Sequence, residues 1–281
     1  MEANLNYSLA KYIRMISAVV SLFSIVSYAN NTIPIIDKST LASAMRMGDL
    51  KTIKRYISAG GNINLSWKDT PFTVKQSLIL RAVWYGKEDI FKFLIEKGAD
   101  VSPIQEYIHI PIRAGRLNIV KPLLAKKITI PNNRKILEAT LKSKNLPMTK
   151  LVTSQVPTIW DNPSLIQMAN YFAPGVVRFL VPKYISPNQD FYIGDSSCQA
   201  PKLVFPNKET EGCEGTIGPL WMHYVLLEDT GMLKFFLKHK VDLNKKVDEF
   251  ISTGENKLVS ALDLAKLLKN NEIYKLLSGK K

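Results

Sequence analysis

Apolar and polar residues alternate along the chain with the spacing of short amphipathic helices. In one such segment Ile90, Phe91 and Leu94 fall on one helical face, while Glu88 and Lys92 fall on the opposite face. A helix this short cannot remove its apolar stripe from water unless that stripe packs on a neighbouring element. The pattern therefore predicts short helices that stack on one another.

The same pattern recurs after 38 residues. Residues 41–64 align without a gap with residues 79–102. Each copy contains a short helix that ends at a glycine, where a left-handed backbone costs least, and a second helix that follows it. The repeat predicts a helix–turn–helix unit. The matched pairs include Ala44 with Ala82, Gly48 with Gly86, Ile53 with Phe91, Gly60 with Gly98, and Asn62 with Asp100.

This repeat resembles the ankyrin-repeat family, most clearly in residues 86–101, 260–265 and 272–277. The resemblance implies an all-α, ankyrin-type solenoid of about seven helix–turn–helix units over about residues 39–281. Within this solenoid we expect a disulfide-bearing loop insertion. Steps between units vary in length, and four units lack the glycine that closes the first helix. The positions equivalent to that glycine are Gly48, Gly86, Gly115, Ser143, Phe172, Glu228 and Lys269.

One step in the repeat is long enough to hold an insertion. Residues 184–219 fall within it and have the Gly, Pro and Ser content of a loop. Both cysteines of the chain, Cys198 and Cys213, lie in this segment. We expect a local disulfide between them, because such a bridge restricts the unfolded loop in an oxidising compartment. Two free thiols are the alternative.

The N-terminus has the features of an export signal. Two basic residues precede an uncharged stretch whose apolar part, residues 16–26, is eleven residues long. A membrane-spanning helix needs about 20 apolar residues, and Ser27 and Ala29 are small residues where a signal peptidase cleaves. We expect a signal peptide over 1–29, a mature repeat domain over 30–281, a periplasmic or secreted location and no stable membrane span after cleavage. A buried N-terminal helix and an uncleaved anchor are the alternatives.

Composition and charge narrow the class of partner. The chain is 46% hydrophobic and 22% charged, as in ordinary globular proteins. Its 38 Lys and Arg residues against 24 Asp and Glu residues give a net charge of +14, which favours acidic proteins, anionic lipid or nucleic acid. No basic run of five residues occurs, so only the overall charge supports nucleic acid, and we do not expect it as a partner.

Sequence motifs for catalysis or metal binding are absent. None of the three histidines, His109, His223 and His239, has a serine or cysteine partner at a recognisable spacing. A zinc site that combined two of them with Cys198 and Cys213 would lack the close ligand pairs of structural zinc motifs. We therefore expect a protein that is not an enzyme and has no catalytic residue, metal or cofactor.

The family resemblance also implies which residues contact a partner, because the two residues before the glycine that closes the first helix commonly face the target. Trp, Tyr and Arg, which dominate protein-binding hot spots, are frequent at these positions. Packing between units is the alternative for the aromatic residues. The expected groove residues are Arg46 and Met47, Trp84 and Tyr85, Arg113 and Ala114, Leu141 and Lys142, and Asn170 and Tyr171. Trp67 and Trp160, in turns between units, are expected as secondary contacts.

The last two units have apolar pairs at the same positions. These pairs are Leu226 with Leu227 and Leu267 with Leu268, and we expect the insertion to fold over them. The binding groove would then extend over the first five units.

The export signal, the candidate disulfide, the repeat scaffold and the lack of catalytic motifs together indicate a function in binding. The leading hypothesis is a periplasmic protein that binds and neutralises another protein. In this it resembles bacterial immunity proteins against envelope-acting secreted toxins such as phospholipases. A secreted effector that binds a host protein and an envelope scaffold are the alternatives.

Overall fold

The structure, a computed structural model, describes residues 36–70, 73–193, 216–250 and 256–279. The predicted signal peptide and the predicted pairing of Cys198 with Cys213 lie outside these residues. Two compact parts make up the chain, one that ends at Ala99 and one that begins at Asp100. Within the described ranges, no helix has both the length and the apolar character that crossing a bilayer requires.

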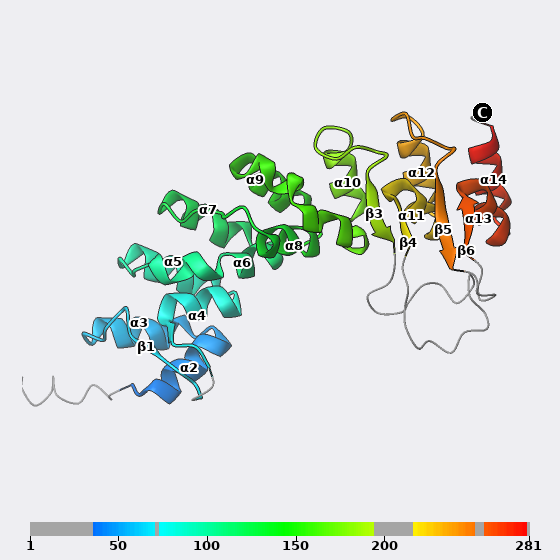
Figure 1. Cartoon of the computed structure of the whole chain (residues 1–281). Helices are drawn as coiled ribbons and strands as arrows, with labels where there is room; N and C mark the ends of the chain where they lie inside the picture. Colours follow the sequence, from blue (N-terminus) through cyan, green and yellow to red (C-terminus); the bar gives the residue numbers. More distant parts are fainter. Residues whose placement is uncertain (1–35, 71–72, 194–215, 251–255, 280–281) are drawn as a thin grey trace, which may run out of the picture. The chain divides into compact units, whose positions relative to one another are not determined.

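The N-terminal part consists of two helix pairs connected by a β-hairpin (Figure 1). The two first helices pack on each other, as do the two second helices. The predicted apolar face of the second pair is confirmed, since Ile90, Phe91 and Leu94 are at most 1% exposed. The elements are α2 (Lys38–Met47), α3 (Leu50–Ser58), β1 (Ser66–Trp67), β2 (Gln76–Ser77), α4 (Leu78–Tyr85) and α5 (Glu88–Glu96).

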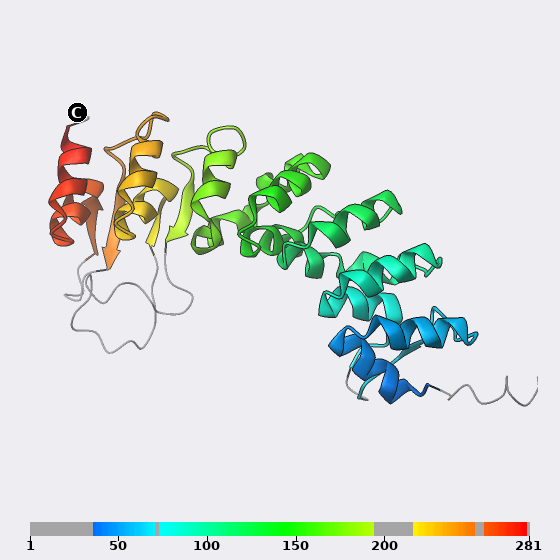
Figure 2. The ribbon, with the colours of Figure 1, turned by 180° about the vertical axis from the view of Figure 1, so that it is seen from behind.

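The C-terminal part continues the arrangement of helix pairs in two layers. Both ribbon views show the second helices α7, α9, α10, α12 and α14 side by side in one layer and the first helices in the other (Figures 1 and 2). Its helices are η1 (Ser102–Tyr107), α6 (His109–Arg113), α7 (Leu117–Ala125), α8 (Arg134–Lys142), α9 (Leu146–Gln155), η2 (Pro157–Asp161), η3 (Pro163–Gln167), η4 (Ala169–Tyr171), α10 (Pro174–Leu180), α11 (Leu220–Leu226), α12 (Thr230–Phe236), α13 (Ala261–Leu267) and α14 (Asn271–Ser278). Its strands are β3 (Asp190–Ile193), β4 (Thr216–Pro219), β5 (Lys246–Phe250) and β6 (Asn256–Ser260).

One expected first helix is absent from this part. Three 3₁₀ segments, η2 to η4, stand in place of the α-helix predicted before Phe172. Pro157 and Pro163 begin the first two segments, and a proline disfavours helical backbone at the residue before it. Asn162 accordingly has an extended ψ of 123°, which separates η2 from η3.

Three β-hairpins modify the prediction of an all-α chain. Each has two antiparallel strands and precedes a first helix: β1–β2 before α4, β3–β4 before α11, and β5–β6 before α13. The ends of the predicted 184–219 loop are strands, with Ile193 opposite Thr216, so the prediction of loop throughout this segment is wrong. Phe191 shows the physical reason: it is fully buried and packs edge-to-face on Phe172, with ring centroids 5.5 Å apart. Such burial favours strand residues.

Left-handed residues close most of the first helices, as predicted. Gly48, Gly86 and Gly115 have positive φ values, and so do Glu228 (φ 55°) and Lys269 (φ 54°). Two predicted positions need correction. Ser143 has φ −63°, and the left-handed residue is its neighbour Lys144 with φ 49°. Phe172 has φ −76° because the helix it was expected to close is absent.

Left-handed residues at the ends of second helices provide a test of backbone strain. Gly98 follows α5 with φ 83°, and Lys127 follows α7 with φ 66°. A Cβ at Gly98 would meet no atom within 4 Å, so only the backbone opposes a side chain there. We expect Gly98→Ala to lower the free energy of unfolding by about 1 kcal/mol, and Lys127→Gly to raise it by about 0.5 kcal/mol.

Urea unfolding followed by circular dichroism would measure both changes. Gly175→Ala is the matched control, because Gly175 lies in α10 without a positive φ and a Cβ there also meets no atom within 4 Å. This control is expected to gain about 0.5 kcal/mol, since alanine restricts the unfolded chain. Equal effects of the two alanine substitutions would contradict the assignment of strain to Gly98.

Candidate protein-binding surface

Large apolar side chains are exposed at one recurring place, the last turn of the first helices. Among the described residues, six large hydrophobic side chains are exposed, and four of them lie one or two residues before a left-handed residue. The other two, Val74 and Ile166, lie in the β1–β2 connection and in η3, so none of the six lies on a second helix. The four are Met47 (78% exposed), Trp84 (43%), Leu227 (55%) and Leu267 (51%).

The geometry of the helix end explains this exposure. Residues three and four positions before the left-handed residue point into the core: Ala44 and Met45 are at most 5% exposed, and Ala82 and Val83 are fully buried. Successive residues of an α-helix turn by about 100°, so the next two residues point away from that core. Lys144 obeys the same rule, because the residues three and four before it are fully buried. Large apolar residues at the two exposed positions therefore keep a substantial part of their surface in water.

In the N-terminal part, four predicted contact residues form a surface that we term the α2–α4 patch: Arg46, Met47, Trp84 and Tyr85. They occupy the C-terminal ends of α2 and α4, which pack on each other. Arg46, Met47 and Trp84 are exposed, and Tyr85 is half-buried. The patch thus combines an aromatic pair with a flexible thioether and a cation, the side chains that are enriched at protein interfaces.

In the C-terminal part, the structure brings together predicted contact residues that lie far apart in the sequence. The Lys142 ammonium lies 4.7 Å from the centroid of the Tyr171 ring, and it also forms an ion pair with Glu138 one turn earlier on α8. The hydrogen bond from Lys142 lowers the pKa of Glu138, and Arg134 and Arg113 lower it further. We term Arg113, Glu138, Lys142 and Tyr171 the Lys142 cluster.

Glu138 was missed by the sequence analysis, although the spacing Glu138 to Lys142 is that of a helical ion pair. The same hydrogen bond raises the pKa of Lys142, so this cation already has a carboxylate partner. Leu141, predicted beside Lys142, is fully buried because the helix end is shifted by one residue. Asn170 lies in η4, and its side chain is outside the described part of the structure. Ala114, predicted with Arg113, is exposed.

The two tryptophans expected as secondary contacts are buried. Trp160 is 3% exposed, and its indole N–H donates to the Thr153 hydroxyl at 3.1 Å. Trp67 is 7% exposed and lies beneath the Arg81 guanidinium, 4.0 Å from the ring centroid. These side chains have almost no surface to offer a partner, so they serve packing in this structure, and we do not include them in the binding surface.

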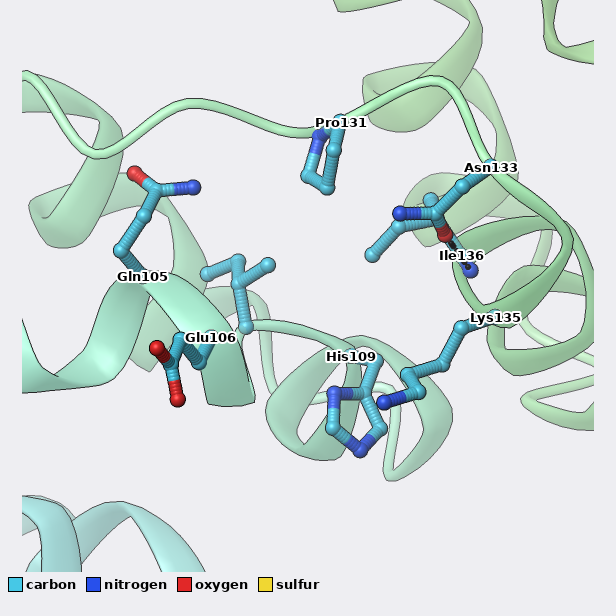
Figure 3. Close-up of a pocket in the computed structure, with 8 residues that line it drawn as sticks. Gln105, Glu106, His109, Pro131, Asn133, Lys135 and Ile136 are labelled. Carbon is cyan, nitrogen blue, oxygen red and sulfur yellow. Dashed lines mark hydrogen bonds between the residues drawn. The ribbon is translucent and has the colours of Figure 1, made fainter.

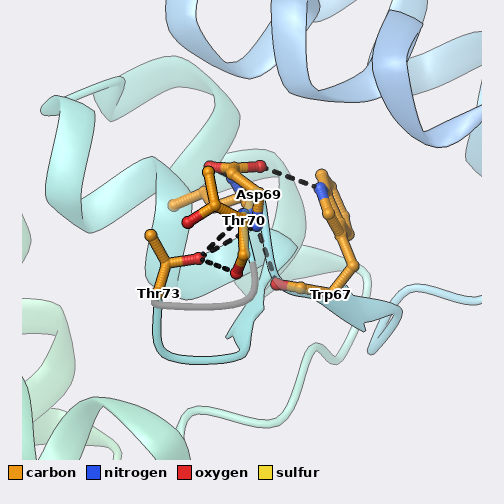
Figure 4. A network of polar contacts seen from close by, with 5 residues as sticks. Trp67, Asp69, Thr70 and Thr73 are labelled. Atoms are coloured by element: carbon orange, nitrogen blue, oxygen red, sulfur yellow. Dashed lines mark hydrogen bonds and ion pairs between the residues drawn. The ribbon is translucent and has the colours of Figure 1, made fainter.

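Polar contacts order the connection that follows Trp67. The indole N–H of Trp67 donates to Asp69 at 3.1 Å (Figure 4). The Thr73 hydroxyl accepts hydrogen bonds from the backbone N–H groups of Asp69 and Thr70, both at 3.1 Å, and donates to the Thr70 carbonyl at 2.9 Å. Exposed Val74 directly follows this network, so the contacts position an apolar side chain at the hairpin.

A pocket of about 310 Å³ lies between η1, α6 and the start of α8 (Figure 3). Burial lowers the pKa of His109, and the nearby charges of Lys135 and Arg113 lower it further. The wall of the pocket contains no serine or cysteine that His109 could activate, so we assign no chemistry to the pocket. The lining residues are Gln105, Glu106, Ile108, His109, Pro131, Asn133, Lys135 and Ile136.

Comparisons with known proteins concern the fold. No family model and no curated protein matches the chain. A matching solved structure is the ankyrin repeat domain of human ASB11, with 16% sequence identity and a TM-score of 0.49 over 86% of this chain and 97% of that chain. The chain is thus similar to an ankyrin repeat domain, as the predicted resemblance implied, and this similarity adds no function to the helix pairs and hairpins described above.

Proposed function

We propose that the chain is a non-catalytic protein-binding module whose contact surface is formed by the last turns of its first helices. The observation that carries this proposal is the exposure of Met47, Trp84, Leu227 and Leu267, each one or two residues before the left-handed residue of its repeat. Burial of exposed apolar groups against a partner lowers the free energy, because it removes them from water. The second helices offer no large exposed apolar side chain among the described residues, so in each of the two parts a partner gains most at the first helices.

The α2–α4 patch is the best candidate for the main anchor. Trp84 and Tyr85 supply large, stiff contact area, and Met47 can adapt its shape to a partner. The Lys142 cluster differs from the patch, because Lys142 is already paired with Glu138 and stacked on Tyr171. The cluster is therefore less suited than the patch to anchor a partner.

We propose further that the partner is an envelope-acting secreted toxin such as a phospholipase, and that the chain acts as its periplasmic immunity protein. The apparent export signal and the excess of positive charge support this. A bound scaffold would cover the entrance of the toxin's active site and would need no chemistry of its own. Inhibition is then stoichiometric. The arrangement of about seven repeats and the disulfide between Cys198 and Cys213 are part of the same proposal.

Affinity capture with matched variants tests the binding surface. The tagged chain would be incubated with envelope and secreted fractions, beside the double variant Met47→Ser, Trp84→Ala and the control variant Lys92→Ala, Glu96→Ala on α5. We expect one protein to be retained by the wild type and the control and lost by the double variant. Calorimetry with that purified protein should show at least about thirtyfold weaker binding, the usual cost of removing an aromatic anchor.

Thermal unfolding of the same variants separates binding from folding. The control variant should unfold within about 0.5 kcal/mol of the wild type, because Lys92 and Glu96 are exposed. The Met47, Trp84 variant should lose no more than about 2 kcal/mol and still unfold cooperatively, because Trp84 is only partly buried. Normal binding by the Met47, Trp84 variant would contradict the proposed surface. Loss of toxin activity at substoichiometric amounts of the chain would indicate an enzyme, and capture of a host protein or an envelope component would favour the alternative functions.

A further inference from the structure

Most second helices of the C-terminal part carry positive charge only, and α14, which contains Glu272, is the exception. Four of them, α7, α9, α10 and α12, with the residues that close them, cover 117–127, 146–155, 174–183 and 230–240 and contain no Asp or Glu. They contain nine exposed Lys and Arg side chains, which we term the second-helix face. The nine are Lys121, Lys126, Lys127, Lys150, Arg178, Lys183, Lys234, Lys238 and Lys240.

In the N-terminal part the two second helices differ in charge: α3 also has exposed cations and no Asp or Glu, whereas α5 does not share this pattern. Helix α5 begins with Glu88 and Asp89 and ends with Glu96, so its cations lie among carboxylates. In the C-terminal part, Lys234 faces Glu272 of α14 at 3.6 Å. The other eight cations form no ion pair with any described residue. Their charges therefore act on the surroundings.

Aromatic rings hold three of the cations against the helix layer. Lys150 lies 5.7 Å from the ring centroid of Phe179, Arg178 lies 5.2 Å from that of Phe235, and Lys183 lies 5.0 Å from that of Tyr184. The three rings are only half-buried, which leaves a partly aromatic floor between the charges. These cation–π contacts link α9 with α10 and α10 with α12, so part of the face is held in place.

We propose that the second-helix face docks on an anionic phospholipid membrane. Both ribbon views place α7, α9, α10 and α12 side by side in the layer that faces away from the first helices (Figures 1 and 2). A protein interface usually needs an apolar anchor at its centre, and no large exposed hydrophobic side chain lies on these helices. Eight of the nine cations are lysines, compact and strongly hydrated charges that suit a diffuse layer of phosphate headgroups.

This docking is separate from the proposed partner binding. Within the C-terminal part, membrane contact would use the second helices and leave the last turns of the first helices accessible. An inhibitor held in this way would be concentrated at the surface on which a membrane-attacking toxin works. The two proposals can fail independently, because they depend on different residues.

Vesicle cosedimentation tests the proposal. The purified chain would be mixed with vesicles of equal parts phosphatidylglycerol and phosphatidylcholine, and with vesicles of phosphatidylcholine alone. We expect binding to the anionic vesicles only, and loss of that binding at about 0.5 M NaCl, where charges are screened within a few ångströms. The triple variant Lys121→Gln, Lys126→Gln, Lys238→Gln should bind the anionic vesicles on the order of a hundredfold more weakly, because each cation that is lost lowers the affinity about fivefold.

A second triple variant controls for net charge. Arg134→Gln, Lys135→Gln and Lys144→Gln remove three exposed cations around α8, in the first-helix layer. This variant should bind the anionic vesicles within about threefold of the wild type, because its charges lie away from the docking face. All variants share residues 1–35, so any effect of that segment cancels in the comparison. The Met47, Trp84 variant should bind vesicles normally.

Three results would overturn the proposal. One is a failure of the wild-type chain to bind anionic vesicles at low salt. Another is an equal loss in both triple variants, which would show that net charge and not the second-helix face drives binding. The third is displacement of the chain from the vesicles by duplex DNA or polyglutamate at matched charge concentration, provided that the Lys121, Lys126, Lys238 variant also loses more affinity for that competitor than for the vesicles.

Discussion

Replacing Asp69 with alanine should lower the free energy of unfolding by about 3 kcal/mol, the lower end of the cost of breaking a buried ion pair. Its partner Arg81 lies on α4 and is 1% exposed. The guanidinium donates to the Asp69 carboxylate at 2.8 Å and to the Trp67 carbonyl at 3.0 Å. Loss of the carboxylate leaves a buried cation with one partner fewer. Asp69 itself is 41% exposed, which is why the lower end applies.

A cycle of variants, measured by urea unfolding, isolates the pair. Adding Arg81→Met to Asp69→Ala should recover more than half of the loss, because an apolar chain of similar length needs no counterion. Asp69→Asn keeps an acceptor and should cost about half as much as Asp69→Ala. A loss below about 1 kcal/mol for Asp69→Ala would make the pair an ordinary surface ion pair.

The Asp69 pair also carries a pH dependence with a definite sign. The hydrogen bond from Arg81 holds the pKa of Asp69 below its ordinary value of 3.8. The contribution of this pair is therefore complete above pH 3.8 and is lost as the pH falls through the lower folded value. The same cycle of variants at pH 3 should show smaller differences than at pH 7.

Acidification from pH 7 to pH 4 should cost up to about 3 kcal/mol through His223 alone, since each unit of pKa shift corresponds to about 1.4 kcal/mol. Burial lowers the pKa of this side chain from 6.5 to about 4. In the unfolded chain His223 therefore takes up a proton below about pH 6.5, whereas in the folded chain the His223 imidazole remains neutral until about pH 4. Stability is complete above pH 6.5, and the loss grows through this window and stops growing below pH 4.

The variant His223→Gln tests this assignment. Glutamine does not titrate, so the difference in unfolding free energy between wild type and variant should shrink or reverse as the pH falls from 7 to 4. Burial also lowers the pKa of His109, so the variant keeps a smaller dependence of its own. Parallel stability curves for the two proteins over this window, from urea titrations at each pH, would show that His223 does not carry the effect.

The sequence predicts the helix pairs best where the signal for them comes from neighbouring residues. In the N-terminal part, the glycines that end α2 and α4 and the spacing of Ile90, Phe91 and Leu94 appear in the structure as predicted. A positive φ and an amphipathic stripe depend on neighbouring residues only, so they leave a signal in a single sequence. The exposed positions of Arg46, Met47 and Trp84 follow from the same helix ends.

The sequence signal for the end of a first helix is weaker where lysine occupies the left-handed position that glycine usually takes. Lysine, unlike glycine, does not favour a left-handed backbone, so the sequence predicts the end of α8 at Ser143, one residue before the left-handed Lys144. The displacement moved a core residue, Leu141, into the predicted contact set. The pattern of buried residues in the folded chain reveals the true end, because Thr140 and Leu141 are both fully buried.

The sequence by itself determined the repeated helix pair, the glycine turns and the last-turn positions of the α2–α4 patch, because these depend on contacts within a few residues. Only the tertiary structure decided the rest. Trp67 is buried because Arg81, 14 residues later, covers its ring, and strand β3 exists because β4 pairs with it across 22 intervening residues. Such contacts depend on which surfaces meet after the helices stack, and a side chain's type alone does not record that.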